Sequence, residues 1–327
     1  MKCLQPVTIK NPHSCVIKYL KDETQYIQVP CGKCYACLAN RRNDMIMRLR
    51  AEKMNSYSSF FITLTYDPEH LPRGNLPYKP HLDRFLNALR MHHMRKYLAL
   101  NPELTQKEFR KKLPQIRYFY VSEFGGEFGR VHYHLLLFNF LLGESYLREL
   151  LKKYWIYSAS WQFDLADAVK PVYNEAITYC CAYCLSSLSP DIPDGLRPLC
   201  NFSRNPGLGS AFLTDDMRRY LNAHPTGKVN CYGDTFRLPR YFTTRLSDSA
   251  RHSIKLARMA DYEKYEKAIR KQCRNDDFRY FRYIDELSES YVRRARKIVK
   301  KQNFYYVDIQ SDICEASSQE CVSNAPH

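Results

Sequence analysis

Two histidines two residues apart are the clearest chemical motif of this chain. The stretch RVHYHLLLF, residues 130–138, places His132 and His134 at the start of an apolar run. Side chains alternate across a β-strand, so both imidazoles point to one face. Leu136 and Phe138 continue that face and the opposite face is also apolar, which predicts a central strand. Such a pair either belongs to the core or binds one metal ion, and nearby acidic side chains favour the metal site.

A carboxylate is the expected third ligand. Glu123 ends the strand predicted for residues 115–124, and the turn GGEFG folds it back alongside His132. Glu127, within the turn, is the second choice. Two neutral imidazoles and one carboxylate leave positions open for phosphate oxygens on Mg²⁺ or Mn²⁺, with zinc as the other occupant.

Two tyrosines one helical turn apart are candidate nucleophiles. Tyr179 and Tyr183 stand at i and i+4 in a helix predicted over residues 174–188, so their phenols share a face. A phenol is a poor nucleophile near its ordinary pKa of about 10. It can nevertheless attack a phosphate that a metal ion polarises, forming a phosphotyrosine. Aromatic pairs at this spacing usually only pack, and the histidine pair is what favours catalysis.

Three cysteines at successive C-x-x-C spacings predict a structural zinc site. The sequence CGKCYAC places Cys31, Cys34 and Cys37 so that they can surround one tetrahedral ion. The alternative is a set of buried thiols at the start of a helix. Candidates for a fourth ligand are Cys3, Cys15 and His13. The cysteines of the tyrosine helix are interpreted as small packing residues: Cys180, Cys181 and Cys184.

The hydrophobic pattern predicts an α+β core over residues 58–190. Strands are expected over residues 58–65, 115–124, 131–138 and 155–164, and helices over 81–98, 144–154 and 174–188. The order β-α-β-β-α-β-α is that of a split βαβ, ferredoxin-like antiparallel sheet with a helix appended.

Other regions flank this core. Residues 1–57 form a cysteine-rich module that ends in a basic helix from residue 37 to 54. Residues 191–304 are expected to be a basic, largely helical extension that contacts DNA. It contains a hairpin around Gly233 and Asp234 and a helical stretch, 241–301, with 17 basic and 9 acidic residues. Residues 305–327 lack lysine and arginine, which predicts a disordered tail.

Composition favours a nucleic-acid partner. The 327 residues carry a formal charge of +16 and include 26 tyrosines and 17 phenylalanines, whose rings can stack on single-stranded bases. No apolar stretch approaches bilayer length, and the start, MKCLQPVTIKNPH, lacks the apolar core of a signal peptide. We therefore expect a cytosolic protein with no membrane partner.

Taken together, the motifs resemble those of HUH endonucleases that initiate rolling-circle replication. The strand FFITLTY, the strand VHYHLLLF and the helix YCCAY occur in the order of that family's three motifs. The pattern is most similar to the replication initiators of microviruses, especially gokushoviruses, and to the A protein of related isometric coliphages. Shared segments include M-C-x-x-P at the start, PCGKCxxC, SEFG (122–125), PGLG (206–209) and LPRYF (238–242).

The resemblance implies residue roles, a reaction and partners. It assigns the divalent ion to His132, His134 and Glu123, nucleophilic attack to Tyr179 and Tyr183, and the fourth zinc ligand to Cys3. The implied reaction nicks the double-stranded replicative form at the origin, leaving a 5′-phosphotyrosine and a free 3′-OH, and later rejoins the displaced circle. The implied partners are single- and double-stranded origin DNA and the host polymerase and helicase, in the bacterial cytoplasm.

The chain departs from the family pattern at three positions. Ala182 and Ser186 stand where the family usually has lysines, which can neutralise the phosphate during transfer. Lys170 is a candidate substitute. Val131 replaces the proline commonly found before the histidines.

Two other functions are alternatives. The missing lysines would suit a non-catalytic, zinc-containing DNA-binding protein, which forms no covalent adduct. An HUH tyrosine transposase would join two DNA ends, usually with a shorter chain that lacks the cysteine module.

Overall fold

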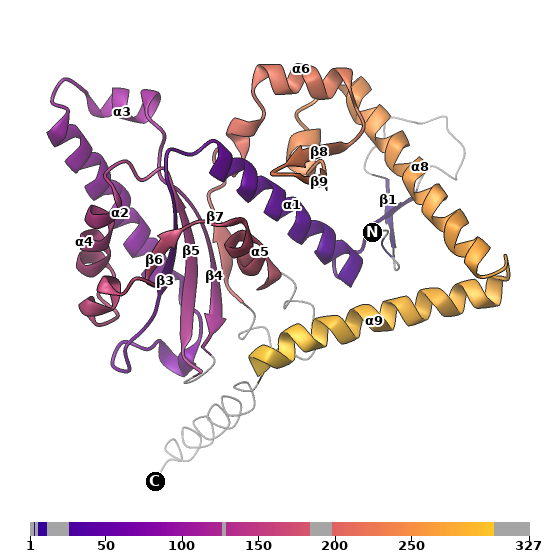
Figure 1. Cartoon of the computed structure of the whole chain (residues 1–327), viewed down its shortest axis with the longest axis horizontal. Helices are drawn as coiled ribbons and strands as arrows, with labels where there is room; N and C mark the ends of the chain where they lie inside the picture. Colours follow the sequence, from indigo (N-terminus) through magenta and orange to yellow (C-terminus); the bar gives the residue numbers. More distant parts are fainter. Residues whose placement is uncertain (1–2, 4–5, 12–25, 126–128, 184–197, 304–327) are drawn as a thin grey trace, which may run out of the picture.

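A five-stranded antiparallel sheet forms the centre of the molecule in the computed structural model, which describes residues 3, 6–11, 26–125, 129–183 and 198–303 (Figure 1). Its spatial order is β6-β3-β5-β4-β7. The strands are β3 (Ser59–Leu64), β4 (Arg117–Phe124), β5 (Val131–Phe138), β6 (Val169–Pro171) and β7 (Cys200–Phe202). The predicted tail, residues 305–327, lies outside the described residues.

Four of these strands have the predicted split βαβ order. β5 lies between β3 and β4 and pairs antiparallel with both, so β3 and β4 run parallel to each other. Helix α2 (Lys79–Leu100) connects β3 towards β4, and α4 (Glu144–Tyr154) connects β5 towards β6. The α+β prediction is thus confirmed at the level of an antiparallel sheet with helices.

The strand predicted for residues 155–164 is wrong. Ser160–Asp164 form a short 3₁₀ helix, η4, and the edge strand is β6, further along the chain. Trp155 and Phe163 are completely buried and fix this segment against the core. Aromatic residues favour strands because strands bury them, and here the same burial occurs without strand pairing.

Further elements were not predicted from the sequence pattern. They are β1 (Val7–Lys10), β2 (Tyr26–Val29), η3 (Arg73–Asn75), α3 (Gln106–Lys112), β7, η7 (Ser210–Phe212) and α6 (Asp215–Ala223). β7 pairs with β4 through Phe119, Tyr120 and Val121. The sheet therefore includes a strand from beyond residue 190, where the predicted core ends.

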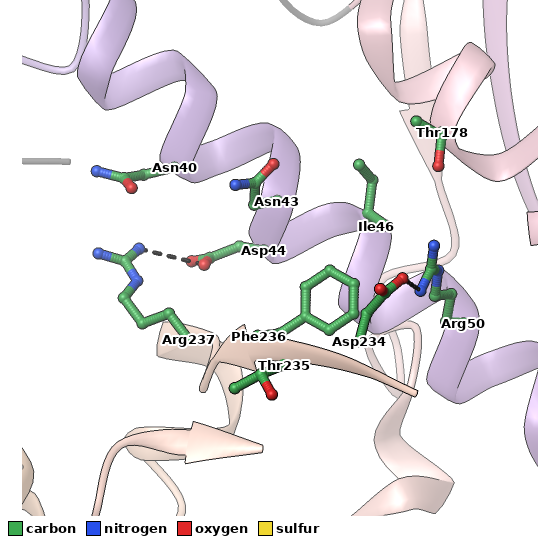
Figure 2. Close-up of a pocket in the computed structure, with 10 residues that line it drawn as sticks. All are labelled: Asn40, Asn43, Asp44, Ile46, Arg50, Thr178, Asp234, Thr235, Phe236 and Arg237. Atoms are coloured by element: carbon green, nitrogen blue, oxygen red, sulfur yellow. Dashed lines mark hydrogen bonds and ion pairs between the residues drawn. The ribbon is translucent and has the colours of Figure 1, made fainter. Parts of the chain in front are cut away.

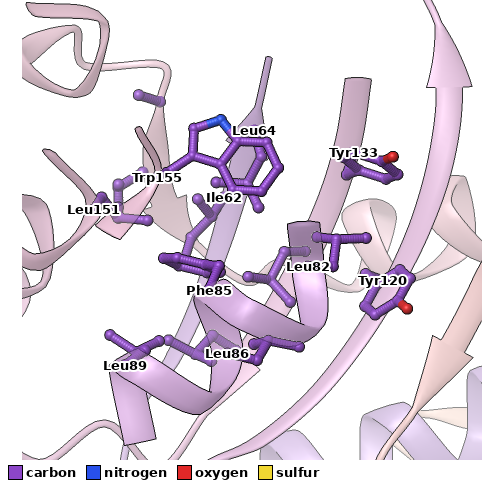
Figure 3. Close-up of a cluster of buried hydrophobic side chains, with 14 of the residues drawn as sticks. Ile62, Leu64, Leu82, Phe85, Leu86, Leu89, Tyr120, Tyr133, Leu151 and Trp155 are labelled. Atoms are coloured by element: carbon purple, nitrogen blue, oxygen red, sulfur yellow. The ribbon is translucent and has the colours of Figure 1, made fainter. Parts of the chain in front are cut away.

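One face of the sheet packs against α2 and α4. Figure 3 shows Phe85 and Leu89 of α2 lying against the sheet beside Ile62, with Trp155 above them. All four side chains are at most 1% exposed. Burial of these large apolar side chains between the sheet and its helices is the main source of stability of this layer.

The other face packs against α1 (Tyr35–Met54) and α5 (Asn174–Ala182), which lie beside the sheet in Figure 1. Ile46 and Leu49 of α1 and Ile177 of α5 pack with Leu136 and Phe138 of β5. This arrangement confirms that β5 is central and apolar on both faces.

The C-terminal part packs against the far side of α1. Its elements are the hairpin of β8 (Lys228–Cys231) and β9 (Asp234–Arg237), then α7 (Arg240–Thr243), α8 (Asp248–Gln272) and α9 (Asp277–Asn303). The hairpin prediction is confirmed, and its turn residues, Tyr232 and Gly233, have φ of 53° and 80°, as a type I′ turn requires.

None of the described helices is both long and apolar enough to cross a membrane.

Candidate active site

Strand pairing brings the two histidines and one glutamate together. Glu123 of β4 lies opposite His132 of β5 in the sheet register. Glu123 Oε2 is 2.8 Å from His134 Nε2 and 3.7 Å from His132 Nε2, and the two imidazole nitrogens are 3.2 Å apart. The structure therefore places all three residues in one cluster, as expected from alternation along the strand. Glu127, the second choice, lies outside the described residues.

Neighbouring groups orient both imidazoles. His134 Nδ1 lies 3.4 Å from the Thr63 hydroxyl, and the ring stacks on Phe61 with centroids 5.2 Å apart. His132 Nδ1 lies 3.5 Å from the carbonyl oxygen of Arg130. These contacts occupy the Nδ1 side of each ring, so both Nε2 atoms face Glu123. Metal-binding histidines are commonly held in this way by a second hydrogen bond.

The donor spacing suits a divalent ion. Adjacent ligands around a six-coordinate ion with bonds of about 2.1 Å are about 3 Å apart. The donor atoms here are separated by 2.8 to 3.7 Å, and their side chains are 10 to 16% exposed. Small rotamer changes would let all three contact one ion while the remaining positions stay open to solvent or a ligand.

The protonation states also suit metal binding. Burial acts to raise the pKa of Glu123, but hydrogen bonds with His132, His134, Tyr183 and Tyr179 outweigh it and hold the pKa far below its ordinary value. Burial lowers the pKa of His134. The site therefore holds an ionised carboxylate beside a neutral imidazole at neutral pH.

Helix α5 places the tyrosine pair directly on this cluster. The Tyr179 hydroxyl donates to Glu123, at 3.0 Å from Oε1 and 2.7 Å from Oε2. The Tyr183 hydroxyl donates to the Tyr179 oxygen at 2.6 Å. Tyr179 is 45% exposed, whereas Tyr183 is 7% exposed. Tyr179 thus forms the rim of the site and Tyr183 lies behind it.

Both phenols are neutral in this arrangement. Burial raises the pKa of Tyr179 most; the hydrogen bond with Tyr183 lowers it, and the Glu123 carboxylate raises it further. Burial, Glu123 and Tyr179 all raise the pKa of Tyr183. Neither tyrosine is activated by its protein surroundings alone, so attack requires a group that stabilises the developing phenolate.

Two of the three departures from the family pattern can be located. Ala182 is the last residue of α5 and is half-buried. The N–H of Val131 donates to Asn75 Oδ1 at 2.8 Å, a bond that a proline there could not form. Ser186 lies outside the described residues.

Lys170, the candidate substitute for the missing lysines, belongs to the edge strand β6. It lies opposite Phe61 of β3, and the next residue but one, Val172, packs into the cluster beneath α1 and α5. Lys170 therefore faces the same side of the sheet as the histidines.

The N-terminal cysteines form a second cluster. Cys3 Sγ lies 3.6 Å from Cys31 Sγ and 3.8 Å from Cys34 Sγ, and Cys31 Sγ lies 4.0 Å from Cys37 Sγ. Four thiolates around a zinc ion with Zn–S bonds of about 2.3 Å are about 3.8 Å apart. The set fits a tetrahedral zinc site, with Cys3 as the fourth member.

Backbone donors support thiolates at Cys3 and Cys31. The N–H of Cys31 donates to Cys3 Sγ and that of Cys34 to Cys31 Sγ, each at 3.3 Å. Burial raises the pKa of Cys31, but the backbone groups of Cys34 and Lys33 lower it more, to about 6. The two other candidates for the fourth ligand, His13 and Cys15, lie outside the described residues.

A polar cavity of about 350 Å³ lies between α1, α5 and β9 (Figure 2). Arg50 of α1 pairs with Asp234, and Asp44 of α1 pairs with Arg237. Arg50 is 8% exposed, although it belongs to the helix predicted to be basic. These pairs join residues 184 and 193 positions apart, so no local signal predicted them. They fasten the hairpin to α1, the helix that also packs on α5.

Comparison with known proteins adds an independent result. Residues 59–187 match the family of the replication-associated protein ORF2. The chain is 24% identical over 230 residues to the replication-associated protein VP4 of Bdellovibrio phage phiMH2K, covering 65% of this chain and 67% of that one. It is 24% identical over 230 residues to the replication-associated protein ORF4 of Chlamydia phage 1, covering 65% and 52%. It is 27% identical over 163 residues to the replication-associated protein ORF2 of Spiroplasma virus 4, covering 44% and 46%.

The matched part spans about two thirds of the first relative and about half of the other two. No solved structure matches the chain. Residues 59–187 contain both histidines, the glutamate and both tyrosines of the cluster. By these matches, the chain is similar to the replication-associated proteins of microviruses.

Proposed function

We propose that this protein is an HUH-type, metal-dependent DNA nickase that initiates rolling-circle replication of a small single-stranded DNA phage. One observation carries the proposal: the Tyr179 hydroxyl contacts the carboxylate that both histidines face. A hydroxyl nucleophile beside a cluster of metal-ligand type is the arrangement that phosphoryl transfer to tyrosine needs.

His132, His134 and Glu123 would hold Mg²⁺ or Mn²⁺, which when bound supplies a Lewis acid for a phosphate oxygen. The protein residues position the reactants. Thr63 and Phe61 fix the orientation of His134, and the Glu123 carboxylate holds the Tyr179 oxygen at the rim of the site. Because the Tyr179 oxygen is already held in position, less entropy is lost when nucleophile and phosphate come together.

The chemistry is a transesterification. The Tyr179 oxygen forms a bond to the scissile phosphorus and loses its proton, while the bond from phosphorus to the 3′ oxygen breaks and that oxygen gains a proton. The products are a 5′-phosphotyrosine and a free 3′-OH. Because one phosphodiester replaces another, the step is reversible, and a second attack by Tyr183 allows the displaced strand to be released and closed.

The remaining parts fit this role. We assign nuclease chemistry to residues 58–190, structural zinc to the module of residues 1–57, and duplex contact to the basic extension of residues 191–304. The partners are the single- and double-stranded origin DNA and the host polymerase and helicase, in the bacterial cytoplasm. The contact between Tyr179 and Glu123 favours catalysis over the non-catalytic DNA-binding alternative, which needs no such contact.

Mass spectrometry of a protein–DNA adduct tests the proposal. The full chain is incubated with Mn²⁺ and the phage's supercoiled replicative form, then digested with nuclease and protease. We expect a nucleotide on Tyr179, and no adduct with His132→Ala. Tyr220→Phe, the same change at an exposed tyrosine of α6, should leave the adduct unchanged. Adduct formation by the double variant Tyr179→Phe, Tyr183→Phe would exclude the mechanism.

A further inference from the structure

An exposed tryptophan lies in the segment η4, which precedes the edge strand β6. Of the chain's two tryptophans, Trp155 is completely buried and Trp161 is 64% exposed. Because burying an indole removes a large apolar area from water, this exposed side chain offers free energy to a ligand that covers it.

The segment that carries Trp161 is firmly held. Phe163 of η4 is completely buried, and Arg148 NH1 of α4 donates to its carbonyl oxygen at 2.6 Å. Lys152 of α4 pairs with Asp164, the last residue of η4. Because the backbone beneath the indole is already fixed, a ligand that contacts it loses little further ordering entropy.

A hydrogen bond ties this segment to the end of β3. Gln162, the neighbour of Trp161, has its Oε1 2.5 Å from the Thr65 hydroxyl, which donates to it. Thr65 follows β3 and lies two positions beyond Thr63, whose hydroxyl contacts His134. Two residues of extended chain span about 7 Å. The hydrogen bond from Thr65 thus joins the segment of Trp161 to the end of β3 that lies near His134.

A lysine lies on the same edge of the sheet. Lys170 of the edge strand β6 faces the catalytic side and is 47% exposed. Its partner Asp167 is 85% exposed, and an ion pair this exposed stabilises the protein little. A phosphate can therefore compete for Lys170 at small cost.

We propose that Trp161 stacks on a base of single-stranded DNA beside the scissile phosphate, while Lys170 contacts the strand's backbone. The inference rests on the proposed function, since it takes DNA as the substrate. It adds that the strand lies unpaired along the β6 edge, because an indole face can stack only on a base that has left the duplex. A positive side chain beside an aromatic ring is the usual combination for such strands.

Intrinsic fluorescence tests the stacking directly. The full chain is titrated with a (dT)₂₀ oligonucleotide without added divalent ions, so that binding is measured separately from cleavage. Stacking should quench the Trp161 emission, and the quench should vanish in Trp161→Phe, whose remaining emission comes from the buried Trp155. A quench that persists in Trp161→Phe would overturn the proposal.

Affinity provides the second measurement, by fluorescence anisotropy of a labelled (dT)₂₀. We expect Trp161→Ala to bind about ten-fold more weakly, and Trp161→Phe to recover part of the loss. Tyr57→Ala is the matched control, because Tyr57 is 72% exposed but precedes the opposite end of β3. Equal losses of (dT)₂₀ affinity in the alanine variants of Trp161 and Tyr57 would contradict a specific binding path for the strand at Trp161.

The salt dependence of the same binding tests Lys170. Lys170→Gln should reduce the slope of log K against log salt by about 0.7, the value for one lost phosphate contact on a single strand. Lys79→Gln removes a lysine of similar exposure, 49%, from a surface ion pair on α2 and should leave the slope unchanged. An unchanged slope in Lys170→Gln would show that Lys170 does not contact the backbone of the strand.

These results separate the two proposals. A chain that shows the Trp161-dependent quench but forms no phosphotyrosine with Mn²⁺ and replicative-form DNA would refute nicking alone. If the parent chain forms the adduct but Trp161→Ala binds (dT)₂₀ as tightly as the parent, only the stacking of Trp161 on the strand is refuted.

Discussion

At the scale of single residues, the two tyrosines are not equivalent. Tyr179 contacts Glu123 and is half exposed, whereas Tyr183 contacts Tyr179 from behind and is almost buried. In the proposed mechanism, an incoming phosphate would meet Tyr179 first. The asymmetry thus predicts an order of action for the pair that their spacing on a helix did not reveal.

The first nick should therefore depend on Tyr179. We expect Tyr179→Phe to abolish nicking of the supercoiled replicative form within one turnover, and Tyr183→Phe to lower its rate by about ten-fold or less, through the lost hydrogen bond to Tyr179. Single-turnover agarose-gel assays measure both rates. Normal nicking by Tyr179→Phe with an adduct on Tyr183 would reverse the order.

A buried histidine away from the site should make stability depend on pH. His93 is 2% exposed, its Nε2 accepts the N–H of Leu141 at 2.9 Å, and burial lowers its pKa to about 4. Above pH 6.5 this histidine is neutral in both the folded and the unfolded state and has no effect. Between pH 6.5 and 4 the unfolded chain takes up a proton that the folded chain excludes, so stability falls as pH falls.

The shift corresponds to about 3 kcal/mol of lost stability by about pH 4. Urea denaturation at a series of pH values from neutral to mildly acidic measures it. His93→Gln, which keeps an acceptor but does not titrate, should show a smaller loss on acidification than the parent does. His224 is exposed, and the control variant His224→Gln should lose as much stability on acidification as the parent does. The same dependence of stability on pH in all three proteins would contradict the role of His93.

At the scale of elements, α1 joins the parts of the molecule. One side of α1 packs on the sheet through Ile46 and Leu49, and another packs on the C-terminal part through Met47 and Ala51. Its first turn follows the cysteine cluster. The helix predicted to be basic is therefore buried on two of its sides.

Two methionines of α1 form a matched test. Met47 is completely buried and Met54 is 49% exposed. We expect Met47→Ala to lower the free energy of unfolding by about 2–5 kcal/mol, because it opens a cavity between α1 and the C-terminal part. Met54→Ala should change it by about 0.5 kcal/mol or less. Chemical denaturation measures both, and equal effects would show that α1 is not buried at Met47.

At the scale of the whole molecule, the zinc-type cluster closes the N-terminal part onto α1. The cluster joins Cys3, before β1, to three cysteines that surround the start of α1. The β1–β2 pair lies between them in sequence. A metal bound here would stabilise folding of the module, since the ligands are far apart in the unfolded chain.

Metal analysis tests this cluster. We expect the purified chain to contain one zinc ion per molecule, and Cys31→Ser to contain none and to unfold at a lower temperature. Cys273→Ser replaces a buried cysteine of the C-terminal part and should keep its zinc. Full zinc content in Cys31→Ser would exclude the site.

Much of the catalytic constellation was predictable from the sequence because it depends on local periodicity. Alternation in β5 put His132 and His134 on one face, and the hairpin brought Glu123 opposite. Helical spacing put Tyr179 and Tyr183 together. The edge strand was misplaced because the aromatic side chains of residues 155–164 serve as buried anchors without pairing, and periodicity alone does not distinguish these roles.

The sequence by itself determined which residues form the candidate sites, since their types and short-range spacing define the two sets of candidate metal ligands and the candidate nucleophiles. Only the tertiary structure decided their relations. It placed Tyr179 on Glu123, 56 positions away in the chain, put Tyr183 behind it, and set Lys170 opposite Phe61 on the side of the sheet that carries the histidines. Packing between distant segments sets these contacts, and no local pattern encodes which side chain ends nearest to solvent.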